Sequence, residues 1–286
     1  LSARNCRRAW TLSRVRHVKA ISRGPRRRSQ MVYVELVGVG LMAGFLAGLL
    51  GIGGGFVVVP ALLLLLPTFG IPAALLPKVA VATSLAAMIP TAAMAVYAQY
   101  KRGAIEYRWL KRMIPGACAG SVAGALLASS VSGTWVAIIF ASYAGYFAVK
   151  MMINRPRASG ERGALSAAIA CCPTPVIGAL IGGFSAIAGV GGASLTVPYL
   201  LSKNTEMKRA VASASAVGLG VALMGACGFA ITLAYAGPQT SSMLVGLVCW
   251  PAALILGAAS SLMVSRGVGL SHRLPARQLK QAFGVV

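Results

Sequence analysis

Five long stretches of this 286-residue chain contain no charged residue. The longest has 56 residues, whereas a helix that crosses a lipid bilayer needs only about 20 apolar residues. About a quarter of the residues of a soluble domain are charged, against 11% here. The pattern therefore predicts an all-α polytopic protein that lies in a lipid bilayer. The uncharged stretches are 36–77, 79–100, 113–149, 163–202 and 210–265.

The chain also carries a formal net charge of +23, from 27 Lys and Arg residues against 4 acidic residues. A charge of that size is typical of proteins that bind nucleic acid. Here, however, the cations cluster between the apolar stretches, and no basic stripe follows a soluble face. We therefore exclude nucleic acid as a partner and interpret the charge as information about orientation in the membrane.

Residues 1–30 differ from the rest, with ten cations, no acid and no apolar run long enough for a signal peptide. One interpretation is that they were included upstream of the true start, with Met31 as the first residue. The other is a targeting or lipid-binding arm, since the stretch is rich in Arg and Ser. In either case we expect this basic arm to be disordered or to form a loosely packed helix.

Turn signals and charges divide the apolar stretches into ten segments. Two of them, 56–66 and 193–201, are too short to span a bilayer, and both follow a cluster of glycines. The full set is 33–50, 56–66, 79–98, 113–131, 135–151, 164–188, 193–201, 210–236, 242–264 and a last segment that starts near residue 279.

An internal repeat relates the two halves of the chain. The pattern Gly44-x6-Gly51-Ile-Gly53-Gly54 returns in the second half as Gly182-x6-Gly189-Val-Gly191-Gly192, and the pattern Lys78-x-Ala-Val-Ala-Thr returns at Lys208 with Ser in place of Thr. We expect one membrane repeat over 31–153, a cytoplasmic linker over 154–163 and a second repeat over 164–286. An odd number of segments in each half requires opposite entry into the membrane, hence inverted topology. Phe283 corresponds to Phe140, so the last helix is expected to be truncated at Val286.

The loops between the segments give the orientation. Alternating sides place four loops with sixteen cations together, and leave only Lys78 on the other side. Cytoplasmic loops carry the excess of Lys and Arg, so these four loops are expected to face the cytoplasm. They are 99–112, 150–163, 203–209 and 265–280.

The two glycine clusters are the candidate substrate site. Successive glycines unwind a helix, and unpaired backbone inside a membrane is tolerated only where it lines a cavity or is buried in protein. We expect re-entrant turns whose following short helices point their N-termini, with partial positive charge and free N–H groups, at a small anion. Nearby hydroxyls would complete the site. The candidate residues are Gly51, Gly53, Gly54, Gly55, Thr83, Ser84, Gly189, Gly191, Gly192, Ser194, Ser213 and Ser215.

Other small residues have a structural interpretation. Glycines spaced four apart mostly allow close packing of membrane helices. Pro60 and Pro198 are expected to shape helices rather than bind substrate. Each hydroxyl has an alternative role as well, because Ser and Thr in helices often bond their own backbone. The glycines assigned to packing are Gly44, Gly48, Gly116, Gly120, Gly124, Gly178 and Gly182.

The sequence lacks the motifs of several classes of protein, and their absence excludes those classes. There is no G-x4-G-K-[ST] nucleotide loop, and the uncharged stretches hold no carboxylate, Lys, Arg or His. A proton relay built on buried carboxylates is therefore not expected. The six cysteines show no metal-binding spacing. We expect no metal, no cofactor and no enzymatic activity.

The doubled motif, Gly44-x3-Gly48-x2-Gly51-Ile-Gly53-Gly54-Gly55-x4-Pro60 with its second copy ending at Pro198, resembles the sulfite exporter TauE/SafE family of membrane permeases over about residues 33–286. The resemblance implies a protein of a bacterial-type cell membrane that moves small anions such as sulfite or organosulfonates. Ala193 replaces Gly55 in the second copy, which predicts an asymmetric site. A channel or carrier for another metabolite and a non-transporting membrane scaffold are the alternatives, and a homo-oligomer is left open.

Overall fold

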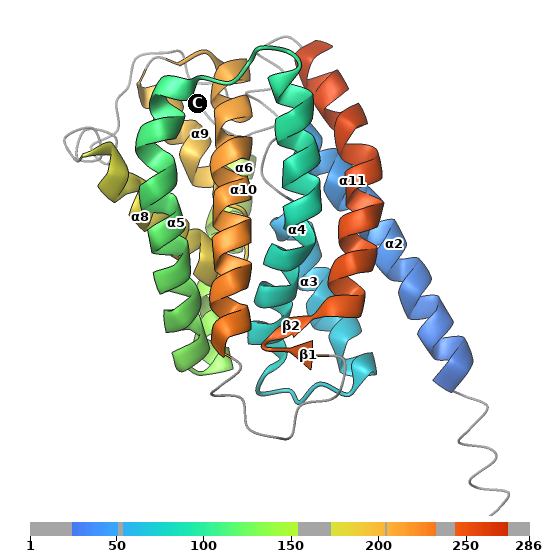
Figure 1. Ribbon diagram of the computed structural model, residues 1–286. Coiled ribbons are helices and arrows are strands. Elements are labelled where there is room, and N and C mark those ends of the chain that lie inside the picture. The colour runs from blue at the N-terminus through green and yellow to red at the C-terminus, as the bar shows by residue number, and fades with distance from the viewer. Residues whose placement is uncertain (1–24, 51–53, 154–172, 204, 233–243, 274–286) are drawn as a thin grey trace, which may run out of the picture.

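The computed structural model describes residues 25–50, 54–153, 173–203, 205–232 and 244–273 (Figure 1). These residues form a helical bundle with one small β-hairpin, which confirms the all-α class. The helices are α2 (Pro25–Leu50), α3 (Gly55–Leu65), the 3-10 helix η1 (Leu66–Phe69), α4 (Leu76–Tyr100), α5 (Tyr107–Ser130), α6 (Gly133–Ile153), α8 (Thr174–Ala188), α9 (Ala193–Ser202), α10 (Met207–Ile231) and α11 (Trp250–Arg273); the strands are β1 (Leu244–Val245) and β2 (Val248–Cys249).

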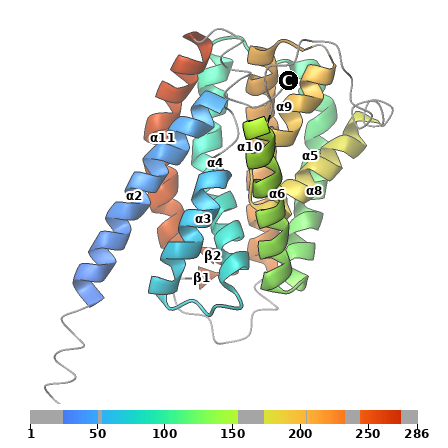
Figure 2. The same ribbon diagram turned by 180° about the vertical axis from the view of Figure 1, so that it is seen from behind.

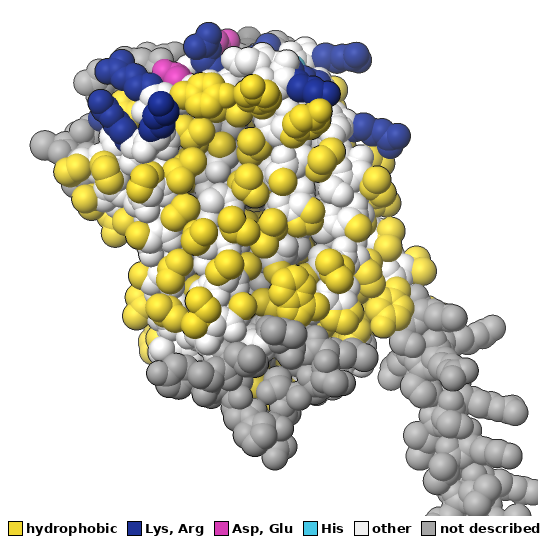
Figure 3. Space-filling model, viewed as in Figure 1, with side chains coloured by type: hydrophobic (Ala, Val, Ile, Leu, Met, Phe, Trp, Pro, Cys, Tyr) yellow, Lys and Arg dark blue, Asp and Glu magenta, His cyan; other side chains and the backbone are white. Residues whose placement is uncertain are grey.

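Five helices of the described part are long and apolar enough to cross a membrane: residues 31–49 of α2, and α4, α5, α10 and α11. Helices α8 and α9 are apolar but shorter, as is the stretch formed by α3 with η1. Hydrophobic side chains cover most of the face seen in Figure 3, whereas Lys and Arg side chains gather at one end of it. The structure therefore agrees with a protein that crosses a membrane several times.

Helices α5 and α2 begin well before the starts that the sequence predicts, because charge does not end a helix. Helix α5 starts at Tyr107 instead of residue 113 and includes Arg108 and Arg112. Long basic side chains at the end of a membrane helix can extend to water while the backbone stays helical. Helix α2 starts at Pro25, a residue type favoured at the first helical position, so residues 25–30 of the expected arm are helical. Residues 1–24 lie outside the described residues.

The segment expected over 242–264 is the largest error. Leu244 pairs with Cys249 and Val245 with Val248 in an antiparallel hairpin, and α11 then runs from Trp250 to Arg273. Gly246 closes the turn with a backbone φ of 68°, which residues with a Cβ rarely adopt. Apolar content alone cannot separate these short apolar strands from a helix. The expected linker 154–163 and the segment near 279 lie outside the described residues.

Helices α4 and α10 form the centre of the bundle. They contact each other along their length, and 72% and 61% of their apolar windows are buried, more than in the other candidate spans. Helix α5 packs along α8 and α10, and α11 packs along α2 and α4. Figures 1 and 2 both place α9 toward the end of the bundle where α4 joins α5, and α3 toward the opposite end.

Glycines hold the outer helix pairs in close contact. A Cβ on Gly120 of α5 would lie 2.0 Å from the carbonyl oxygen of Ala179 in α8, and one on Gly44 of α2 would lie 2.1 Å from that of Ser260 in α11. Real Cβ atoms essentially never approach another atom within 3.0 Å. The packing interpretation of the spaced glycines is therefore confirmed, with similarly short backbone approaches at Gly48, Gly116, Gly124, Gly178 and Gly182.

Candidate functional site

Both short helices start at a glycine in the left-handed backbone region. Gly54 precedes α3 with a φ of 75°, and Gly192 precedes α9 with a φ of 70°. Gly189 ends α8 with a φ of 69°. This region costs a residue with a Cβ roughly 1–2 kcal/mol. The glycine clusters therefore end one helix and start another, as expected; Gly51 and Gly53 lie outside the described residues.

The two glycine breaks, defined as Gly54–Gly55 and Gly189–Gly192, contact each other. A Cβ on Gly55 would lie 2.4 Å from the carbonyl oxygen of Gly189 and 2.9 Å from Cα of Val190. The hydroxyl of Ser84 in α4 donates a 3.1 Å hydrogen bond to the same Gly189 oxygen. On the other side, a Cβ on Gly218 of α10 would lie 2.5 Å from the oxygen of Gly191. The central helices α4 and α10 thus both contact the second break, which in turn contacts the first.

Backbone dipoles dominate the electrostatics at this contact. No ionisable Asp, Glu, Lys, Arg or His occurs in the sequence between Glu35 and Lys78 or between Arg162 and Lys203, the stretches that contain both breaks. The N-termini of α3 and α9 therefore supply the partial positive charge. Two of the amides are used inside the second break itself, since Gly192 N–H bonds to Val190 O and Ala193 N–H bonds to Gly191 O.

The candidate hydroxyls divide into two groups. Ser84 reaches the second break directly, and the Ser194 hydroxyl, in the first turn of α9, forms a 2.5 Å hydrogen bond with the hydroxyl of Tyr143. Ser215 lines a cavity beside Gly191, although its hydroxyl donates to Val211 O at 3.0 Å within α10. These three residues come together with the breaks.

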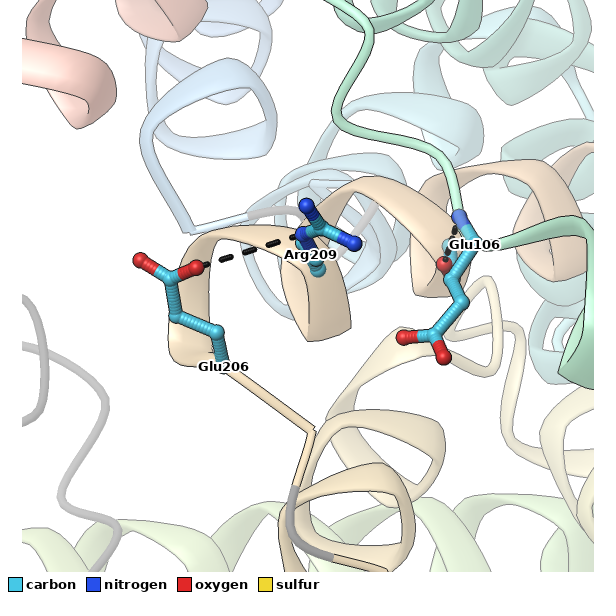
Figure 4. Close-up of polar contacts among 4 residues, drawn as sticks. Glu106, Glu206 and Arg209 are labelled. Carbon is cyan, nitrogen blue, oxygen red and sulfur yellow. Dashed lines mark hydrogen bonds and ion pairs between the residues drawn. The ribbon is translucent and has the colours of Figure 1, made fainter.

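Thr83 and Ser213 instead fix the starts of two long helices. The Thr83 hydroxyl oxygen accepts the backbone N–H of Cys249, just before α11, at 3.0 Å. The Ser213 oxygen accepts the N–H of Glu106, just before α5, also at 3.0 Å (Figure 4). In this conformation both oxygens take part in helix anchoring rather than in the contact between the breaks.

A small cavity lies beside the second break. The centre of a water molecule can move through about 20 Å³ of this cavity, so the cavity holds about one water molecule. A second cavity of about 10 Å³ shares Met88 and Thr91 with it. The first is lined by Ala47, Met88, Thr91, Ala92, Ala95, Gly191, Ser215 and Gly218.

Sequence reasoning missed Tyr143, Met88 and Thr91. Tyr143 of α6 stacks on Phe56 of α3 at 5.3 Å between ring centroids and meets Phe184 of α8 edge-on at 5.0 Å. It therefore bridges the elements on both sides of the breaks. Met88 lies one helical turn after Ser84, and that spacing is the signal that could have placed it on the same face of α4.

The two prolines stay outside this contact. Pro60 and Pro198 are each the sixth residue of their short helix, more than one turn after the break. Pro60 is exposed and Pro198 is half-buried. Their positions fit the prediction that they shape these helices. Among the described residues, no group of three His, Cys, Asp or Glu side chains could hold a metal ion.

Comparison with known proteins gives the family. The model of the sulfite exporter TauE/SafE family matches residues 36–286. A Haemophilus influenzae protein named "Probable membrane transporter protein" is 30% identical over 247 residues, covering 86% of this chain and 92% of the relative. A similarly named Methanocaldococcus jannaschii protein is 26% identical over 250 residues, covering 86% and 88%. No solved structure matches the chain.

The family match covers both glycine breaks, α2 from residue 36 onward, the other long helices described above and the β-hairpin. The apolar helices and the transporter names of the relatives agree with it. This chain belongs to the sulfite exporter TauE/SafE family of multi-pass membrane transporters.

Proposed function

We propose that this chain is a secondary transporter that moves a small anion, sulfite or an organosulfonate, across a bacterial cell membrane. The observation that carries the proposal is the contact between the two glycine breaks, where a Cβ on Gly55 would lie 2.4 Å from the oxygen of Gly189. The N-terminus of α3 lies at this contact, and the second break leads from it into the N-terminus of α9. Neither glycine break contains a charged side chain, and helix N-termini favour an anion. Ser84, Ser194 and Ser215 would supply hydroxyl donors once substrate replaces their present partners.

Matched hydrogen bonds support an inverted repeat with re-entrant glycine turns. Lys78 donates to Ser129 O at 2.7 Å, and Lys208, its counterpart in the second half, donates to His272 O at 3.1 Å. The acceptors correspond as well, because Ser129 and His272 are the same number of residues apart as Glu106 and Cys249. Glu106 and Cys249 are the residues whose N–H groups bond to Ser213 and Thr83. Each half thus makes the same lysine bond from its inner helix, α4 or α10, to the helix that follows. Helices α3 and α9 extend from the breaks toward opposite ends (Figure 1).

The size of the cavity suggests how substrate moves. Sulfite has four heavy atoms, and the present cavity of about 20 Å³ holds about one water molecule. The two repeats must therefore shift relative to each other to admit the anion from one side and release it on the other. Inverted-repeat transporters work in this way around a fixed central site.

The test is flux of ³⁵S-sulfite and of a small sulfonate in proteoliposomes that contain the purified protein. A carrier should show counterflow, in which unlabelled anion inside accelerates uptake of labelled anion, whereas a channel should not. Imposed pH and sodium gradients would identify a coupling ion. Absence of flux for every anion would favour the non-transporting scaffold and contradict the proposal.

We further propose that the basic end of the bundle faces the cytoplasm. In a background without cysteines, Val131→Cys should react with a membrane-impermeant maleimide on intact cells. Lys101→Cys, which follows α4 at the opposite end of the bundle, should react only after permeabilisation. Both side chains are exposed to the surroundings of the bundle. Labelling of Lys101→Cys on intact cells, with none of Val131→Cys, would contradict this orientation.

A further inference from the structure

Met88 of α4 fills the space between the two glycine breaks. The side chain is 2% exposed, and its terminal methyl carbon lies 2.5 Å from the point that a Cβ on Gly55 would occupy. The methyl group therefore uses room that the glycine leaves open at the first break. Met88 also lines the cavity that contains Gly191 of the second break. A single apolar side chain thus contacts the first break and borders the space beside the second.

The matching position in the other half carries no side chain. The repeat that aligns Lys78 with Lys208 also aligns Met88 with Gly218. A Cβ on Gly218 would lie 2.5 Å from the oxygen of Gly191, so this side of the cavity is formed by backbone. Of these two matched positions, only Met88 places a side chain in the cavity, and changes at Gly218 cannot enlarge the free volume.

We infer that Met88 sets the upper size limit of the transported anion. This inference rests on the proposed function and specifies the substrate class for the same site. The thioether chain is unbranched and flexible, so it can move aside for an anion of the size of sulfite or methanesulfonate. A sulfonate with a longer carbon chain has to occupy the volume of the Met88 side chain itself. Met88 would discriminate between anions by their size and not by their charge, because its side chain is uncharged.

Transport by Met88→Ala in proteoliposomes tests the inference, with sulfite and butane-1-sulfonate as substrates. The variant should raise the ratio of butane-1-sulfonate flux to sulfite flux by about tenfold or more, the usual scale for a steric change of one or two methylenes in an apolar pocket. Met88→Leu, which keeps most of the volume, should leave the ratio near that of the wild type. Met94→Ala is the matched control, because Met94 lies on the same helix and is 39% exposed.

Three results would overturn the inference. The ratio could stay unchanged in Met88→Ala, rise equally in Met94→Ala, or already favour butane-1-sulfonate in the wild type. If Met88→Ala does not fold, Met88→Val removes less volume and must still raise the ratio. A wild-type protein that moves neither anion contradicts the proposed function itself, whereas normal sulfite flux with an unchanged ratio contradicts only the role of Met88.

Discussion

Gly120→Ala is expected to destabilise the folded protein by about 3 kcal/mol or more, at the upper end of the usual cost of overpacking. The added methyl would lie 2.0 Å from the carbonyl oxygen of Ala179 and 2.7 Å from its Cα. These are backbone atoms, so no side chain can rotate away, and α5 and α8 must separate along their whole contact. At roughly 2–4 °C per kcal/mol, the apparent melting temperature should fall by about 10 °C.

Loss of the monodisperse peak in size-exclusion chromatography, after heating in detergent, measures this effect. Gly145→Ala on α6 is the matched control, since nothing lies within 4 Å of a Cβ placed there. That change should be neutral or slightly stabilising, because alanine favours a helix more than glycine does. Equal melting of Gly120→Ala and the wild type would show that α5 and α8 do not pack through this glycine.

Gly191→Leu is expected to reduce sulfite flux by about a hundredfold or more, equivalent to roughly 3 kcal/mol in the barrier to transport. Gly191 is buried and lines the central cavity, which holds about one water molecule and so has no room for a leucine side chain. Its carbonyl oxygen also faces Gly218 closely, which leaves the second break no room to move aside. The substitution should therefore close the path of the anion at the contact between the breaks.

Flux per reconstituted protein, measured against Gly38→Leu, isolates this effect. Gly38 is exposed on α2, and nothing lies within 4 Å of a Cβ placed there. Ser84→Ala should reduce sulfite flux by a smaller factor, because it removes the 3.1 Å hydrogen bond to Gly189 O without adding volume. Ser261→Ala, an exposed hydroxyl that bonds Ala258 O, is its control. Unchanged flux in both Gly191→Leu and Ser84→Ala would rule out the glycine breaks as the site.

The all-helical class and the positions of most helices along the chain could be predicted from two sequence patterns with a direct physical meaning. Long uncharged stretches predicted the membrane helices, and clustered glycines predicted where α3 and α9 begin. An uncharged stretch determines whether a segment prefers lipid to water, and a glycine cluster determines where the backbone can change direction. Both effects depend on neighbouring residues in the chain, so they can be predicted from the sequence alone. The β-hairpin at 244–249 could not be predicted in this way, because its residues are as apolar as those of the helix expected there.

The site was predictable only in part, for a related reason. Glycines at which the backbone changes direction can be recognised in the sequence because they are clustered. The hydrogen-bond partner of a hydroxyl depends instead on which helices pack together. Thr83 and Ser213 were expected near the anion, yet they accept backbone N–H groups at the starts of α11 and α5. Met88 and Tyr143 belong to helices whose contact with the breaks arises only in the folded bundle. Their residue types alone indicate nothing beyond an apolar core.

Locating the bound anion tests most directly whether the glycine breaks form the substrate site. Selenite has the shape and charge of sulfite, and its selenium atom can be located by anomalous X-ray scattering in crystals grown in thiol-free buffer. We expect a selenium peak at the contact between the two glycine breaks, beside Gly55 and Gly191, which disappears in Gly191→Leu crystals. Selenium peaks found only among the Lys and Arg side chains at the end of the bundle would contradict this assignment.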